Sequence, residues 1–109
     1  MRSLPLLFLF GCLGPTGASV CYDNAITSAQ ICELDLERSE LDQRQQDCDY
    51  NEGYVQSVGC ATDYKKLTDC VSNAIAGKAC EDINDAINEE CAYLAGRLQG
   101  CLPQNNPAQ

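Results

Sequence analysis

The sequence predicts an all-α fold, namely a small disulfide-braced helical bundle of three to four helices. Apolar residues and cysteines recur at helical spacing, most clearly in the second half of the chain. No stretch alternates apolar and polar residues as a half-buried strand does. The chain is also short and rich in cysteine, so crosslinks are expected to supplement a modest hydrophobic core.

Residues 1–19 are predicted to be a signal peptide that is cleaved off. Arg2 precedes an apolar run from Leu4 to Leu13, and small residues follow, with a cleavage site after Ala18 or Ser19. The alternative is a membrane anchor, but a bilayer requires about 20 apolar residues and this run is half that length. No later segment is as apolar, so we expect a secreted, extracellular protein without membrane insertion.

Cleavage would remove Cys12 and leave an even number of cysteines. In an oxidising compartment these are expected to form four structural disulfides. The cysteines concerned are Cys21, Cys32, Cys48, Cys60, Cys70, Cys80, Cys91 and Cys101. Eight cysteines allow 105 pairings, so the spacing does not determine the connectivity.

Residues 20–102 are predicted to be a single disulfide-rich helical domain. Cys21 and Cys32 lie eleven residues apart, which is about three helical turns. A sparse apolar face continues the pattern through Ile31, Leu34, Leu41 and Cys48. The pattern predicts one helix from Cys21 to about Asp49, followed by a turn at 51–53; the alternative is a break near Ser39.

The sequence pattern in the second half of the domain predicts two further helices. Residues 60–76 carry apolar positions at helical spacing, and Gly77 suits the end of that helix. The last helix is predicted over 80–101 from one stripe with steps of three and four residues: Cys80, Ile83, Ile87, Cys91, Leu94, Leu98 and Cys101. A turn at 77–79 would fold this helix back antiparallel, and the segment 103–109 is expected to be a flexible tail.

The charge of the chain restricts its partners. Without Arg2, six basic residues remain against sixteen acidic ones, a formal charge of −10. Nucleic acids and anionic membrane surfaces are bound through basic patches, so neither is expected as a partner.

Catalytic and metal chemistry are not expected, and no cofactor is predicted. The chain has no histidine, which most nucleophilic and zinc sites use. Asp47 begins a stretch that resembles a calcium loop, but Glu52 and Val58 occupy the positions that require glycine and glutamate. We therefore expect a protein that is not an enzyme and has neither catalytic nor metal-binding residues.

Binding to another protein is the function that the sequence favours. Tyr50, Tyr54, Val55 and Val58 form the candidate contact patch, because tyrosine is favoured at interfaces. The alternative for these residues is that they close one end of the core. A venom-type or salivary-type effector, or a diffusible signal, would be consistent with this hypothesis. Two other functions stay open, a carrier of a small apolar ligand and a structural component of a secreted matrix.

Overall fold

The computed structural model describes residues 16–103. Within this range the elements are α2 (Gly17–Ile31), α3 (Arg38–Ser57), α4 (Ala61–Ile75), a 3-10 turn η1 (Cys80–Asp82) and α5 (Ile83–Cys101). Four disulfides brace these helices, and the described range contains no strand. The predicted disulfide-braced all-α bundle is confirmed.

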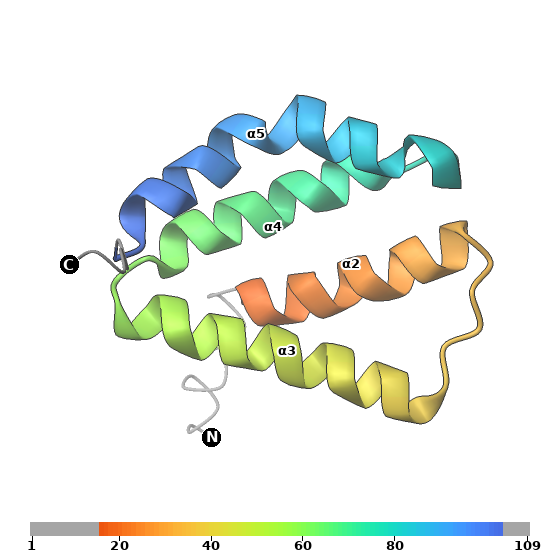
Figure 1. Ribbon diagram of the computed structural model, residues 1–109, viewed down its shortest axis with the longest axis horizontal. Coiled ribbons are helices and arrows are strands. Elements are labelled where there is room, and N and C mark those ends of the chain that lie inside the picture. Colours follow the sequence, from red (N-terminus) through yellow and green to blue (C-terminus); the bar gives the residue numbers. More distant parts are fainter. Residues whose placement is uncertain (1–15, 104–109) are drawn as a thin grey trace, which may run out of the picture.

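The four helices form two antiparallel hairpins that lie side by side (Figure 1). Helices α2 and α3 make one hairpin, and α4 and α5 make the other. The spatial order is α5, α4, α2, α3, so α2 packs on both α3 and α4, while α5 packs mainly on α4. The helices thus form an open layer and do not surround one central core.

The hydrophobic core is correspondingly divided into two small clusters. Val55, Cys60 and Tyr64 form the first, where the end of α3 meets the start of α4. The second lies between α4 and α5, around Ala74 and Cys91. Small residues and cysteines supply much of the buried surface. The disulfides therefore contribute a large part of the stability of the fold.

The first helix ends earlier than the sequence predicts. The prediction of one helix from Cys21 to about Asp49 is wrong, because α2 ends at Ile31 and Glu33 adopts a left-handed conformation with φ of 55°. A capping box then starts α3: the backbone N–H of Glu37 donates to Glu40 Oε1 at 2.9 Å, and the Glu37 carboxylate caps the first turn in return. The break precedes Ser39 by several residues.

The predicted turn at 51–53 is also wrong, because these residues lie within α3. The buried residues Cys48 and Val55 are seven positions apart, so the inward face of the helix continues through Gly53 without interruption. Helix α3 ends only at Ser57, and Gly59 follows with φ of 78°.

The second half agrees with the sequence pattern. Gly77 has φ of 73° and follows the end of α4, as a helix-ending glycine does. The turn at 77–79 leads into α5, which runs antiparallel to α4 (Figure 1). Helix α5 begins three residues later than predicted, since Cys80–Asp82 form the 3-10 turn.

Two predicted segments, most of the signal peptide and most of the tail, lie in residues 1–15 and 104–109, outside the described range. The predicted boundary at residue 19 falls inside α2, whose N-cap is Thr16. The N–H of Ala18 donates to Glu52 Oε1 at 3.1 Å, and a Cβ on Gly17 would lie 2.6 Å from Cδ2 of Tyr64. Cleavage after Ala18 or Ser19 would therefore remove a packed first turn of α2.

Candidate functional site

The eight predicted disulfide cysteines are all paired, each within the chain. The pairs are Cys21–Cys48, Cys32–Cys80, Cys60–Cys101 and Cys70–Cys91. Three of these pairs tie helices within a hairpin, and the pair Cys32–Cys80 ties the end of α2 to η1. Their role is structural, since a cysteine in a disulfide has no free thiolate to act as nucleophile or ligand.

The structure divides the predicted contact patch. Val55 is only 3% exposed and belongs to the first core cluster, against which the half-buried Val58 also packs. Tyr50 and Tyr54 are 74% and 41% exposed. Only the two tyrosines are therefore available to a partner, while the two valines close the end of the core.

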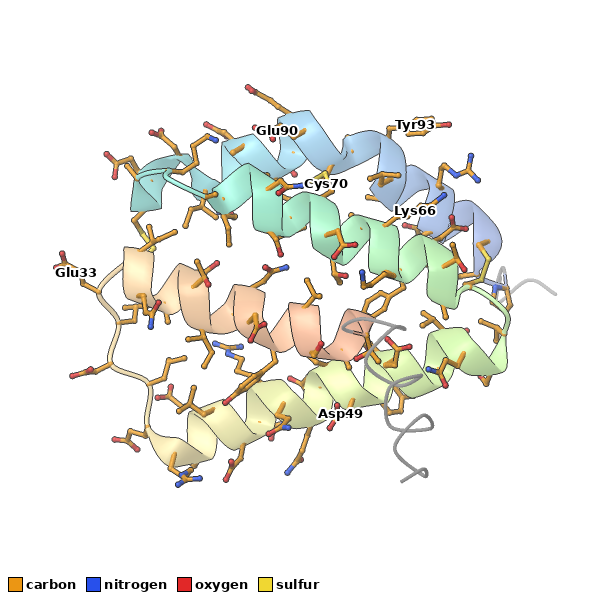
Figure 2. The ribbon with its side chains drawn as sticks, turned by 180° about the vertical axis from the view of Figure 1, so that it is seen from behind. Glu33, Asp49, Lys66, Cys70, Glu90 and Tyr93 are labelled. Carbon is orange, nitrogen blue, oxygen red and sulfur yellow. A yellow bond between two sulfur atoms is a disulfide. The ribbon has the colours of Figure 1, made fainter. Side chains whose placement is uncertain are left out.

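Tyr50 lies on the outer face of α3, away from the other helices. Cys48 marks the inward face, and a residue two positions along an α-helix is rotated by about 200°. Tyr54 follows one turn later on the same side. Exposed acidic residues flank the two tyrosines, and Figure 2 shows Asp49 on this helix. The outer face of α3 thus combines aromatic surface with negative charge.

An apolar groove lies at the opposite end of the α2–α3 hairpin and was not predicted. A groove of about 450 Å³ opens between the second half of α2, the 32–37 loop and the start of α5. It is lined by Ala25, Ser28, Ala29, Cys32, Leu34, Leu36, Arg44, Cys80, Ile83, Asn84 and Ile87. We refer to this site as the loop groove.

A smaller hollow adjoins the loop groove. Ala29, Leu34 and Leu36 line both, and the second hollow, of about 160 Å³, adds Ile26 and Leu41. Leu34 is 61% exposed although it lines both hollows. The sequence signal for this site was the pair Leu34 and Leu36, which a continuous helix would have placed on different faces.

A third hollow, of about 440 Å³, lies between α4 and α5 and is polar. Lys66, Cys70 and Glu90, which Figure 2 labels, are among its lining residues together with Asp69. Its acidic groups already have cations: Lys65 Nζ is 2.7 Å from Asp69, and Lys78 Nζ is 3.7 Å from Glu90. The two acidic groups are therefore compensated, whereas Lys66 takes part in none of the ion pairs of residues 16–103.

Within residues 16–103, the pKa values of Tyr64 and Arg97 depart from their ordinary values. Burial raises the pKa of Tyr64; the nearby Glu52 carboxylate adds to the rise, and the Asn51 side chain opposes it. The pKa of Arg97 is also raised, because its guanidinium donates to the Tyr93 hydroxyl at 3.5 Å and lies near Asp63.

Residues 16–103 contain no group of three or more His, Cys, Asp or Glu side chains placed to hold a metal ion. None of the helices in that range combines the length and apolar character needed to cross a membrane.

Comparisons of the chain with protein-family models, with curated proteins and with solved structures gave no match. The two candidate sites, the outer face of α3 and the loop groove, are inferred from the residues of this chain alone.

Proposed function

We propose that this chain is a secreted, non-enzymatic protein that binds another protein through the outer face of α3, as a diffusible effector or signal does. The observation that supports this most strongly is the exposure of Tyr50, at 74%, on a helix that packs against the bundle along only one side. Four disulfides within one short chain are typical of an extracellular protein.

The partner surface is expected to be basic. Helix α3 carries four exposed acidic residues, Glu40, Asp42, Asp47 and Asp49, against Arg38 and Arg44. Charges of one sign on the rim of an interface accelerate association with an oppositely charged partner, and salt weakens the effect. The tyrosine rings would supply the apolar anchor at the centre.

Rigidity favours this use of the surface. The Cys21–Cys48 disulfide fixes α3 to α2 opposite the exposed face, so α3 does not have to become ordered when it binds. A preorganised surface loses less conformational entropy in a complex than a flexible one.

The test compares two tyrosines of nearly equal exposure. Tyr50 on α3 is 74% exposed and Tyr93 on α5 is 72% exposed, so Tyr93→Ala is the matched control for Tyr50→Ala. The wild type and both variants would be crosslinked to components of the native secretion or target tissue, and the captured protein would then be measured by surface plasmon resonance.

Tyr50→Ala is expected to weaken the captured complex by about 2 kcal/mol, as for an interface anchor, while Tyr93→Ala leaves it unchanged. The association rate should also fall as salt is raised. A complex that survives Tyr50→Ala at full affinity, or a partner that binds equally at low and high salt, would contradict the proposal.

The alternative function, as a structural component of a secreted matrix, would be favoured by cysteines that pair between chains. Interchain crosslinking needs unpaired cysteines, and every cysteine in residues 16–103 is already paired within the chain.

A further inference from the structure

The walls of the loop groove are apolar on three sides. Helix α2 supplies Ala25 and Ala29, the loop supplies Leu34 and Leu36, and α5 supplies Ile83 with Ile87 further along. The Cys32–Cys80 disulfide also lines the groove and ties two of these walls together. A volume of about 450 Å³ lies within the range of about 300–1,000 Å³ that is typical of small-molecule sites.

Helix α2 gives the groove one long wall. A separate, smaller hollow also has Ala29, Leu34 and Leu36 in its lining and adds Ile26 and Leu41. Residues 25–32 of α2 line the larger hollow over about 10 Å at the helical rise per residue. This shape suits a narrow aliphatic chain better than a broad ring system.

Among residues 16–103, Arg44 is the only charged side chain that lines the groove. The ion pairs found in residues 16–103 use Lys65, Lys78 and Arg97, so Arg44 has no acidic partner in the described structure. A guanidinium presents a planar fork of donors that matches a carboxylate. In a chain with sixteen acidic residues, an unpaired arginine beside an apolar groove is complementary to one anionic group.

The loop beside the groove carries acidic residues that disfavour a ligand with several negative charges. Glu33, Asp35 and Glu37 are exposed in this loop, and Figure 2 shows Glu33 at the bend after α2. The negative potential of these carboxylates repels polyanions such as phosphorylated headgroups or nucleic acids. One carboxylate can pair with Arg44, whereas several charges would meet this repulsion.

We propose that the loop groove binds a free fatty acid, with its aliphatic tail along Ala25, Ala29 and Leu36 and its carboxylate on the guanidinium of Arg44. The polar side chains of Ser28 and Asn84, which also line the groove, are available to the carboxylate or to water beside it. This site is separate from the outer face of α3 at Tyr50, so it adds a second binding activity to the proposed one.

The test measures binding of saturated fatty acids of increasing length, and of their methyl esters, below their micelle concentrations by isothermal titration calorimetry. The proteins are the wild type, Arg44→Gln and Arg38→Gln. Arg38 is the matched control, since it is an exposed arginine on the same helix that does not line the groove. Circular dichroism verifies that each variant keeps its helices.

For the wild type, the dissociation constant should fall about three- to fourfold with each added methylene until the groove is full. Arg44→Gln should weaken binding of the acid about tenfold and leave binding of the ester unchanged, as expected for one charge-assisted pair near solvent. Arg38→Gln should change neither. Ala25→Phe should block the groove and abolish the dependence on chain length.

Three results would overturn the proposal: no binding at any chain length, acid and ester bound equally by the wild type, or equal losses in the two arginine variants. Tyr50→Ala should bind fatty acid like the wild type. The two binding proposals can therefore fail independently, because each has its own variant and its own ligand.

Discussion

Of the four disulfides in residues 16–103, Cys32–Cys80 is the one that joins the α2–α3 hairpin to the α4–α5 hairpin. The other covalent connection between the hairpins is the chain itself, which passes through Gly59 at the opposite end of the layer (Figure 1). The Cys32–Cys80 bond also differs in accessibility, since Cys32 is half-buried and Cys80 is exposed. Each of the other three bonds includes a buried cysteine, namely Cys48, Cys60 or Cys91.

Limited reduction should therefore open Cys32–Cys80 first, because a thiolate reductant can approach either of its sulfur atoms, whereas one cysteine of each other bond is buried. The measurement is brief treatment with a mild thiol, alkylation of the free cysteines and peptide mass spectrometry. Label should appear at Cys32 and Cys80 before any other pair. Earlier labelling of Cys70 and Cys91 would show that accessibility in the folded state does not control the order.

Replacing Gly77 by alanine should destabilise the protein by about 1 kcal/mol, because its φ of 73° is unfavourable for a residue with a Cβ. No atom lies within 4 Å of the added Cβ, so the cost is conformational and not steric. Gly96→Ala is the control: it lies within α5, also in open space, and should stabilise by about 0.5–1 kcal/mol. Urea denaturation measures both, and equal signs for the two variants would refute the conformational explanation.

Asn24→Ala should cost about 2 kcal/mol, because Asn24 bridges the seam between α2 and α4. Its Nδ2 donates to the Thr68 carbonyl at 3.0 Å, and its Oδ1 accepts from Ser72 Oγ at 2.6 Å. Loss of the amide removes both hydrogen bonds between the helices, and only the bond from Ser72 Oγ to the Thr68 carbonyl, at 3.3 Å, remains. The exposed Asn88 on α5 provides the control, since Asn88→Ala should change the free energy of unfolding by less than about 0.5 kcal/mol.

The free energy of unfolding should fall in alkaline solution because the phenol of Tyr64 ionises. Burial and then the Glu52 carboxylate raise the pKa of this phenol above its ordinary value of 10.0 in the folded protein. The unfolded chain therefore loses the proton first, and the contribution of Tyr64 to stability is full below pH 10 and declines above it, until the folded phenol also ionises.

The variant for this prediction is Tyr64→Phe. The hydroxyl is buried and makes no well-aligned hydrogen bond within residues 16–103, so phenylalanine should preserve the stability at pH 7. Denaturation by urea at several pH values from neutral to alkaline should show a smaller decline in the variant than in the wild type. Parallel curves for the two proteins would mean that another group governs the alkaline loss.

The second half of the fold could be predicted from sequence because its signals are local and agree with one another. Gly77 ends α4, and the stripe through Ile83, Ile87 and Cys91 defines the inward face of α5. Each of these features depends on residues within a few turns of one helix. The antiparallel pairing then follows from the short connection.

The first half was harder because its apolar residues are sparse. A seven-residue spacing from Leu34 through Leu41 to Cys48 fits a continuous helix, yet Leu34 belongs to the loop. The decisive signal was the capping box of Glu37 and Glu40, in which glutamate takes the N-cap position that serine, threonine, asparagine or aspartate usually occupies. The loop groove depends on this break, so it could not be predicted without it.

The contact patch shows a different limit. Tyr50, Tyr54, Val55 and Val58 are close in sequence, but helical geometry turns Val55 toward the core and Tyr50 toward solvent. The prediction that these four residues form one patch assumed that they cluster around a turn at 51–53. With α3 continuous, only the tyrosines remain on the surface.

The open layer of helices has a calorimetric consequence. Apolar surface that is already exposed in the native state adds nothing to the heat capacity change of unfolding, and crosslinks keep part of the unfolded chain compact. With two small clusters as its core, this protein should have a heat capacity increment below the usual value of about 12–15 cal/mol/K per residue. Its free energy of unfolding should accordingly vary little with temperature, giving a broad, shallow stability curve that declines slowly in both cold and heat.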